Sequence, residues 1–429
     1  MPVFTSSIEV TTDYPTIKPS LNLNFTRARA LDPRITFTRA SVGTYVGRDG
    51  LIKTAGNDEA RFDHDPVTLE SLGFLIEESR TNIIYGGPGQ ANLVVSSGQA
   101  NSLTGNNDAY KLAKNSSSNS QSHGSWSVNG NVSTSSYVMS IFVKKINHSK
   151  FFMQTVVQSA DNLYVYIDID TGVTSHTDYT ASGNLTVTTS IETYTDGWYR
   201  IISRVQGSAT NTLASGFRFG FGDPSNGSQQ YTNTDDEVLV YGAQIEDGSF
   251  ATSYIPSVDS TSSVTRQDDF GSITGESFSS FFNQTEGTFD VGYKLGEDNV
   301  GMRVAQVSNG SASTAIDLVV GSGSGQGGYW FIITGGTTQF SSSNVTNSSQ
   351  VDRNFRAVLA YKENDVAAQS NKITAGPTTD TNVTLATDYD RLSFYQIANN
   401  GDHIQGHLKF IRYYPKRLTN AQVTLFSQD

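Results

Sequence analysis

The sequence predicts an all-β protein with an N-terminal arm, a small β adaptor, two antiparallel β-sandwich domains and one short C-terminal helix. Three observations predict this fold class. Tyr (20 residues), Phe (23) and Gly (39) are abundant and charged residues make up only 16% of the chain, which favours strands joined by many turns. Short apolar or alternating runs recur at regular spacing, as in jelly-roll sandwiches. The length of 429 residues exceeds that of one typical domain.

Composition and charge exclude several function classes. The net charge is −12 at pH 7, and no basic stripe offsets it, so we expect no nucleic-acid partner. Cysteine is absent, which excludes disulfides, thiol chemistry and Cys-based zinc sites. The sequence has no run of 18 apolar residues, and its first residues lack the pattern of a signal peptide. We therefore expect neither a membrane span nor a secretory leader.

Residues 1–20 are rich in Thr, Ser and Pro, and we expect an arm here rather than a folded domain. The arm is too polar and too short to bury a core of its own. It nevertheless carries apolar residues at Phe4, Ile8 and Val10. Such a segment becomes ordered by adding a strand to a partner chain or by lying in its groove, so we predict that these residues form the attachment site.

Residues 21–85 read as a small β adaptor, in which glycines separate brief strands. Residues 44–46 and 51–52 are strand-like and flank a hairpin turn at 48–50. The charged group Asp63-His64-Asp65 follows. It is either a metal cluster or, as we favour, a charged loop held by a neighbouring arginine.

Residues 86–256 predict the first sandwich, of the jelly-roll type. The gaps between its strands hold turn residues such as Asp170-Thr171-Gly172, and Trp198 opens a strand beside a turn, which favours a structural role. The expected strands are 137–143, 151–157, 163–169, 198–205, 217–221 and 238–245.

Residues 257–286 predict a Ser/Thr-rich linker, whose apolar cluster Phe278, Phe281 and Phe282 should pack back on a domain. A second sandwich is expected over 287–429, with a helix over 418–426 that begins at a capping box of Thr419 and Gln422.

One strand offers the best candidate for ligand binding. Its alternation places Tyr164, Tyr166 and Asp168 on the face opposite the core, where aromatic rings could stack on sugars and a carboxylate could accept hydroxyl hydrogen bonds. In the alternative, the tyrosines pair across strands or are covered. Asp168 and Asp170 also precede a Thr-Gly turn, so a local turn role is the alternative to ligand or calcium binding for them.

Metal and catalytic residues are weakly indicated. Asp235 and Asp236 form an acidic pair before a strand, and closely spaced carboxylates can bind calcium; no other cofactor is expected. A glycosidase needs two carboxylates across a cleft, and no Glu-x-Asp-x-Glu triplet occurs. We therefore expect no enzyme and no catalytic residues, although a lyase using Tyr, His or Arg stays open.

One set of short stretches within residues 37–82, continued in two later stretches, forms a signature. Its residues are Thr38–Ser41, Gly43–Tyr45, Asp49-Gly50, Arg61–Pro66, Leu75–Glu77, Arg80–Asn82, Tyr241–Glu246, Tyr254–Pro256 and Val264–Arg266. This signature resembles that of bacteriophage virion proteins, chiefly tail-fibre and other appendage subunits, in which it precedes β-sandwich modules like carbohydrate-binding modules. Such modules often hold a structural calcium near the corresponding strand, so the resemblance makes Asp235 and Asp236 candidates for a calcium site. Near the C-terminus, residues 410–422 resemble concanavalin-A-like (laminin-G-type) domains.

The resemblance implies a virion structural protein, a tail-fibre or appendage subunit on the exterior of the particle that contacts host surface polysaccharide. The implied partners are other virion proteins at the N-terminal end and further copies of the chain, with a trimer favoured. The charged groups of residues 37–82 are expected to form contacts with other protomers or virion proteins. A capsid decoration or head-fibre protein is an alternative, and a polysaccharide depolymerase is another.

Overall fold

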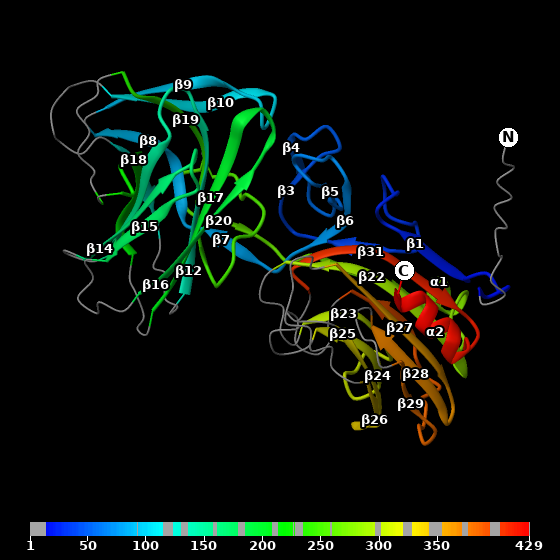
Figure 1. Cartoon of the computed structure of the whole chain (residues 1–429). Coiled ribbons are helices and arrows are strands. Elements are labelled where there is room, and N and C mark those ends of the chain that lie inside the picture. The colour runs from blue at the N-terminus through cyan, green and yellow to red at the C-terminus, as the bar shows by residue number, and fades with distance from the viewer. Residues whose placement is uncertain are drawn as a thin grey trace, which may run out of the picture. The chain divides into compact units, whose positions relative to one another are not determined.

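The computed structural model describes residues 14–91, 93–114, 123–129, 136–157, 161–178, 185–207, 213–225, 227, 235–257, 260–296, 302–320, 328–342, 354–370, 376–394 and 404–428. Over these residues the chain is nearly all β (Figure 1), and the predicted all-β fold with antiparallel sandwiches is confirmed. The chain divides into two compact units, each discontinuous in sequence. Unit 1 comprises residues 1–38, 72–77 and 270–429, and unit 2 comprises residues 39–71 and 78–269.

These units differ from the predicted domain boundaries. The expected adaptor, residues 21–85, is shared between the two units instead of forming a body of its own. The expected linker, residues 257–286, contains β20 (Val264–Arg266) in unit 2 and β21 (Phe270–Thr274) in unit 1. The difference arises because the partner strands of these segments lie far away in sequence, which a local pattern does not reveal.

Unit 2 is a sandwich of two antiparallel sheets whose inner faces share one apolar core. One sheet has the strand order β16 (Thr186–Thr193), β17 (Trp198–Gln206), β12 (Ser136–Lys145), β19 (Glu237–Asp247), β10 (Asn106–Lys114) and β9 (Leu93–Asn101). The other has the order β15 (Thr174–Asp178), β14 (Asp161–Asp168), β13 (Lys150–Val157), β18 (Leu213–Phe221), β11 (His123–Val128) and β8 (Ile84–Ala91).

The alternation of apolar residues explains the core of unit 2. Phe217, Phe219 and Phe221 share one face of β18 and are at most 1% exposed, as the period of two predicts. A second, smaller apolar cluster lies on the other face of the β12–β19 pair, around Phe142 and Trp198. Trp198 is fully buried and its Nε1 donates to Ser102 Oγ at 3.0 Å, which confirms its structural role.

A short hairpin, three small strands and one 3₁₀ turn complete unit 2. Strands β3 (Gly43–Val46) and β4 (Ile52–Ala55) pair with each other, and β5 (Phe62–His64) follows. The Ile52 amide donates to the Leu103 carbonyl, and the Ile52 side chain packs against the smaller apolar cluster. The hairpin is therefore fixed to the turn between β9 and β10. Strand β7 (Arg80–Asn82) pairs with β20, and the 3₁₀ turn η2 (Thr195–Gly197) precedes β17.

Unit 1 contains two further antiparallel sheets. In one, the order is β29 (Thr378–Asp380), β28 (Asp365–Ser370), β27 (Asn354–Lys362), β22 (Glu286–Leu295), β31 (Gly406–Tyr414) and β6 (Ser71–Ile76), with β1 (Leu21–Asn24) also paired to β31. In the other, it is β2 (Thr36–Thr38), β21, β30 (Arg391–Ser393), β23 (Arg303–Ser308), β24 (Ala315–Val320), β25 (Gly328–Thr334) and β26 (Thr337–Ser341).

Glycine permits the close approach of β6 to β31. Gly73 has a φ of +108°, and an added Cβ would lie 2.3 Å from the Leu408 carbonyl oxygen. Phe278 on α1 (Gly275–Ser279) and the following Phe281 and Phe282 are buried in the aromatic core of unit 1, so the prediction that they pack on a domain is confirmed. The helix α1 itself falls inside the predicted linker and was missed.

The C-terminal helix α2 (Asn420–Gln428) is confirmed with its capping box. The Gln422 amide donates to Thr419 Oγ1 at 3.3 Å, and the Thr419 amide donates to Gln422 Oε1 at 3.0 Å. Val423 and Phe426 pack against Val358 on the outer face of β27. Among the described residues, no helix is long and apolar enough to cross a membrane.

Candidate functional site

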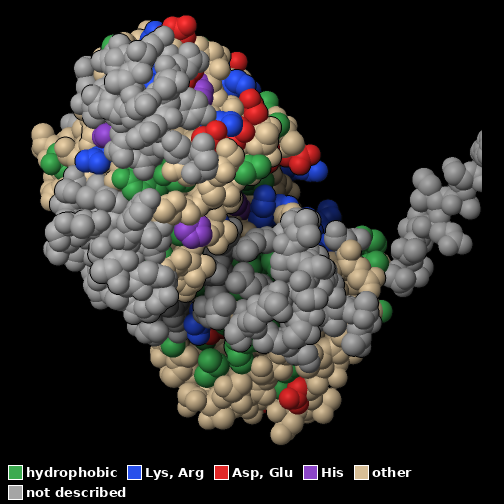
Figure 2. Space-filling view, turned by 60° about the vertical axis from the view of Figure 1, so that its left-hand side comes forward, with side chains coloured by type: hydrophobic (Ala, Val, Ile, Leu, Met, Phe, Trp, Pro, Cys, Tyr) green, Lys and Arg blue, Asp and Glu red, His purple; other side chains and the backbone are tan. Residues whose placement is uncertain are grey.

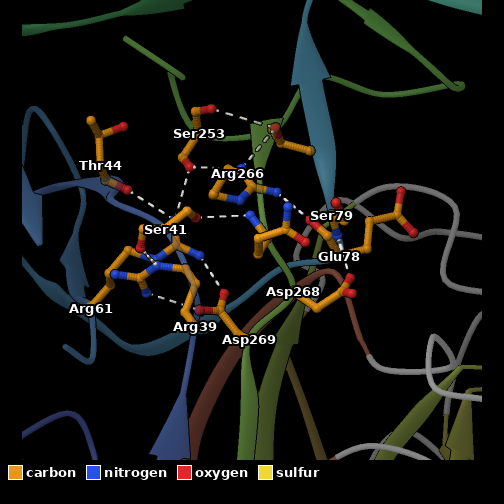
Figure 3. Close-up of polar contacts among 12 residues, drawn as sticks. Arg39, Ser41, Thr44, Arg61, Glu78, Ser79, Ser253, Arg266, Asp268 and Asp269 are labelled. Carbon is orange, nitrogen blue, oxygen red and sulfur yellow. Dashed lines mark hydrogen bonds and ion pairs between the residues drawn. The ribbon is translucent and has the colours of Figure 1, made fainter. Parts of the chain in front are cut away.

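The signature segment builds a buried charged network within unit 2 (Figure 3). Arg39 and Arg61, both at the protein interior, flank the carboxylate of Asp269. Arg39 donates from NH1 to Asp269 Oδ1 at 3.0 Å and from NH2 to the Gly56 carbonyl at 2.7 Å. Burial lowers the pKa of Arg39, and the charge of Asp269 opposes that shift. One carboxylate therefore joins two arginines from separate stretches of the signature.

Arg61 and Arg266 extend the network to the segment after β19. Arg61 NH1 donates to the Thr44 carbonyl at 3.0 Å and to Ser253 Oγ at 2.9 Å. Arg266 NH1 donates to Ser253 Oγ at 3.1 Å and to Thr252 Oγ1 at 3.0 Å. Both guanidinium groups thus meet on one serine, as Figure 3 shows.

Asn82, the last residue of β7, organises the neighbouring backbone. Its fully buried side-chain amide donates to the carbonyls of Ala243 and Ile255 and to Ser257 Oγ, at 3.0–3.2 Å. Its Oδ1 accepts from the amides of Ile84 and Ile245, at 3.0 and 3.1 Å. One side chain therefore contacts five polar groups that the fold removes from water, with its two amide hydrogens shared among three of them.

These contacts correct one expectation. The arginines of residues 37–82 were expected to form contacts with other protomers or with virion proteins. Arg39 and Arg61 are instead 1% and 0% exposed and are engaged inside unit 2. The sequence alone suggests that these arginines are exposed, because Asp269, their counter-ion, lies more than 200 residues further along the chain.

A polar cleft of about 500 Å³ opens in unit 2. Thr44 connects it with the network: its carbonyl accepts from Arg61, and its hydroxyl donates to the Tyr254 carbonyl at 2.5 Å. The walls come from β3, β4, the β9–β10 pair, β19 and the residues Tyr254, Pro256 and Ser260. Three pieces of the signature therefore meet at this cleft, those beginning at Gly43, Tyr241 and Tyr254.

Aromatic and hydrogen-bonding groups line the cleft together. Tyr110 is half-buried, whereas Tyr241 and Tyr254 are 9% and 3% exposed. Burial raises the pKa of the Tyr241 hydroxyl, and the charges of Tyr254 and Asp108 raise it further. Tyr241 is therefore a neutral hydrogen-bond donor at physiological pH.

Asp108 supplies the carboxylate of the cleft, and its neighbours orient it. Its Oδ1 accepts from Asn101 Nδ2 at 2.8 Å and from Thr104 Oγ1 at 2.9 Å. The exposed amides of Asn106 and Asn107 lie beside it. Among the described residues that line the cleft there is no lysine or arginine. The cleft thus offers the partly exposed ring of Tyr110, amides, hydroxyls and one carboxylate, which suits an uncharged polyhydroxylated ligand.

The structure places the predicted sugar-contact residues away from this cleft. Tyr164 and Tyr166 lie on the predicted face of β14, with ring centroids 6.2 Å apart and planes within 15°. They pack with Phe152 and are 7% and 1% exposed. At this exposure Tyr166 has no surface for a sugar ring, which favours the alternative interpretation as packing residues.

Asp168 has the local turn role that was its alternative. Its backbone amide donates to the Val173 carbonyl, its carbonyl accepts from Gly172, and its Oδ1 accepts from the Asp170 amide at 3.1 Å. Burial opposes ionisation, but hydrogen bonds from Ser149 and from the Asp170 backbone hold the pKa of Asp168 below its usual range. Asp168 is only 7% exposed.

The remaining predicted site residues are the acidic pair Asp235 and Asp236 and the attachment residues of the arm. Asp236 is buried and its Oδ2 lies 3.3 Å from His148 Nδ1, while the Asp235 carbonyl accepts from Asn147. Among the described residues, no three potential metal-ligating side chains converge. The attachment residues Phe4, Ile8 and Val10 lie outside the described residues.

No family model and no curated protein matches the chain. Several solved structures match the chain with low TM-scores. A Trypanosoma rangeli sialidase in complex with the inhibitor DANA has a TM-score of 0.27 and 10% identity, over 79% of this chain and 62% of the sialidase. Mouse laminin α1 domains LG4-5 have a TM-score of 0.22 and 11% identity, over 79% of this chain and 88% of that one.

A third similar structure is the ligand-binding domain of botulinum neurotoxin serotype D in complex with N-acetylneuraminic acid. Its TM-score is 0.19 with 10% identity, over 77% of this chain and 92% of that one. Of the sialidase, the chain spans less than two thirds of the length. All three TM-scores are below 0.3, so these likenesses transfer no activity or ligand to this chain.

The comparisons do correct one expectation. The missing carboxylate triplet predicts that the chain is not an enzyme, yet an enzyme is among the similar structures. The expectation is contradicted because the triplet is one device among several, and its absence does not separate binding folds from hydrolytic ones.

Sequence reasoning missed the cleft. Its residues come from stretches that lie far apart in sequence, and the sequence does not show that these stretches meet. The signal that could have found it is the group Asn106-Asn107-Asp108 directly after Gly105 and two residues before Tyr110. Amides, a carboxylate and a tyrosine at the start of a strand are typical of a ligand-binding edge.

Proposed function

We propose that this chain is a bacteriophage virion structural protein, an appendage subunit on the particle exterior that contacts host surface glycans through the cleft of unit 2. The observation that carries the glycan part is the composition of the cleft. Tyr110, Tyr241 and Tyr254 lie together with the amides of Asn106 and Asn107 in about 500 Å³, a volume ordinary for a small-molecule site.

The cleft chemistry suits a neutral sugar. The half-buried ring of Tyr110 can cover part of the apolar face of a pyranose, while amides and the Asp108 carboxylate can pair with its hydroxyl groups. Because Asp108 keeps two hydrogen bonds from its neighbours, its orientation is set before a ligand arrives. Pre-orientation of this kind lowers the entropic cost of binding.

The virion part of the proposal rests on the sequence signature. Signature residues supply Arg39, Arg61, Asn82 and Arg266 to the interior of unit 2, and Thr44 to the cleft. In the proposal the signature maintains a scaffold, and the cleft beside it carries the ligand. Assembly into a homo-oligomer, with a trimer favoured, would multiply weak single sites.

The N-terminal end is proposed as the attachment to other virion proteins. Residues 14–20 already belong to unit 1, because Ser20 donates to the Tyr413 carbonyl at 2.9 Å and Ile17 packs beside α2. The part of the arm that is proposed to bind the particle, with Phe4, Ile8 and Val10, therefore precedes residue 14.

Binding to an array of purified bacterial capsules and lipopolysaccharides tests the glycan part. We expect a dissociation constant in the millimolar range for one protomer, about −4 kcal/mol. Asn107→Ala and Tyr110→Ala should weaken binding about tenfold, because each removes a cleft contact. Asn57→Ala is the matched control, since Asn57 is also an exposed asparagine of unit 2 but does not line the cleft.

Three outcomes decide the test. Loss of binding in both cleft variants, with the control unchanged, supports the cleft. Equal binding by all variants would move the glycan site elsewhere. Release of reducing ends from the bound polysaccharide, abolished by Asp108→Asn, would replace the binding role by a polysaccharide depolymerase.

A further inference from the structure

A second cavity, of about 490 Å³, lies in unit 1 and differs in chemistry from the cleft of unit 2. The segment 14–19 forms one wall. Arg356 on β27, Arg412 on β31 and the aromatic residues Tyr414 and Phe426 form the rest. Two guanidinium groups thus enter a cavity of ligand size in a chain whose net charge is −12.

The charge of the cavity follows from its contacts with Asp290. Arg356 pairs with this fully buried carboxylate in bidentate geometry, from Nε to Oδ1 at 2.7 Å and from NH2 to Oδ2 at 2.9 Å. Such a pair satisfies the directional needs of both groups. The charge of Asp290 is therefore neutralised by Arg356.

Arg412 is the surplus cation. Its NH1 donates to the same Asp290 Oδ2 at 3.2 Å, a longer contact than either bond from Arg356, and its side chain is 30% exposed. The ring of Phe410, whose centroid is 4.4 Å from the Arg412 Cζ, holds the guanidinium in place. Lys18 adds a further positive charge to the lining.

The other walls offer rings and hydroxyl groups. Tyr14 is 52% exposed, and its ring centroid lies 6.0 Å from that of Phe426. The pKa of the Tyr414 hydroxyl is raised by burial and by Asp290, so this hydroxyl stays protonated at neutral pH. An exposed tyrosine ring beside a fixed guanidinium matches a ligand that combines a carboxylate with a flat, hydroxylated ring.

We propose that this cavity binds the carboxylate of an acidic sugar, such as a uronic or sialic acid residue, with Arg412 as the anion-binding residue and Tyr14 as the ring contact. The site is separate from the cleft of unit 2, where the described lining residues include no cation. It does not depend on the function proposed for that cleft.

Isothermal titration calorimetry on the full chain at low salt tests the proposal, with galacturonate, glucuronate and N-acetylneuraminate trimers as probes. We expect at least one probe to bind, and Arg412→Gln to weaken it about tenfold or more because a charge-assisted hydrogen bond is lost. The affinity of Arg412→Lys should fall between those of the parent and of Arg412→Gln, since lysine keeps the charge but not the planar guanidinium group. Tyr14→Ala should weaken binding without unfolding, because this side chain is half exposed.

Arg48→Gln is the control for overall charge, because it removes one positive charge at an exposed position of unit 2. Retention of the Arg356–Asp290 pair predicts an unchanged melting temperature for Arg412→Gln. The proposal fails if no acidic trimer binds, if neutral maltotriose binds equally well, or if Arg48→Gln weakens binding as much as Arg412→Gln. Equal binding of a triglutamate peptide would assign the cavity to acidic protein segments instead.

Discussion

Replacing Asn82 by alanine should destabilise unit 2 more than any single surface substitution. The side chain is fully buried; its two amide hydrogens are shared among three acceptors, and its Oδ1 accepts from two backbone amides. It joins β8 to β19 and to the segment after β19, which lie more than 150 residues further along the chain. Alanine would leave the amides of Ile84 and Ile245 without this acceptor inside the protein.

The magnitude follows from the number of groups affected. A typical hydrogen bond contributes about 1 kcal/mol net, and an orphaned buried group costs about 1–3 kcal/mol. Relaxation and water entry recover part of this, so we expect a loss of about 4 kcal/mol. For a unit of this size that corresponds to a fall of about 8–16 °C in melting temperature. Asn82→Asp should cost at least as much, because a carboxylate oxygen would face the carbonyls of Ala243 and Ile255.

The three tryptophans allow the two units to be followed separately. Trp126 and Trp198 belong to unit 2 and Trp330 belongs to unit 1. In a Trp330→Phe background, the fluorescence transition therefore reports unit 2 alone. A shift in melting temperature no larger than that of the exposed control Asn57→Ala would refute the reasoning. Asn82→Ala can also be tested in a protein that retains only Trp330. There, an equal shift of the transition of unit 1 would refute it as well.

Four further results are expected. Asp269→Asn should destabilise unit 2 by about 3–5 kcal/mol, because Arg39 and Arg61 lose their counter-ion; denaturant titration measures it. Burial, and secondarily Arg218, lower the pKa of His123 from 6.5 to about 4. The unfolded chain therefore binds a proton first as pH falls, so stability is kept above pH ~6.5 and drops by about 2 kcal/mol towards pH ~4. Comparing melting temperatures of His123→Gln and the parent across this range checks the sign, since the variant should lack this component. Thr419→Ala should cost unit 1 about 1 kcal/mol through loss of the α2 cap, read from Trp330. Deletion of residues 2–13 should leave unit 1 folded and abolish incorporation into particles, which immunoblots of purified virions measure; normal copy number would refute the proposed attachment.

The sequence predicted the strands of unit 2 well and their wider connections poorly. Strands such as β18 carry alternating phenylalanines, and this alternation survives in the fold because both inner faces bury their apolar side chains. The division into units was not predictable in the same way. Strand β1 pairs with β31, and Leu21 lies opposite Tyr413. A local pattern indicates that such a segment is a strand but not which strand is its partner.

The candidate site shows the same limit. The three tyrosines of the cleft come from β10, from β19 and from the segment that follows β19. Each of them alone has the appearance of an ordinary strand residue. The predicted face of β14 has a denser aromatic pattern, yet its tyrosines pack on Phe152 and are covered. Aromatic density in a strand therefore predicts burial as readily as ligand contact.

The buried network bears on how the signature should be interpreted. Arg39 and Arg61 share Asp269 as acceptor, and Arg61 and Arg266 share Ser253. Removal of one member therefore takes a hydrogen-bond partner from the charged groups of the others in the interior. We therefore expect the residues of this network to be retained together in related proteins, whatever ligand each protein binds. Asn106 and Asn107 are exposed and have no part in this network, so they can change at little cost in stability. We therefore expect proteins that share the signature to share the scaffold, and to differ in ligand through the turn between β9 and β10.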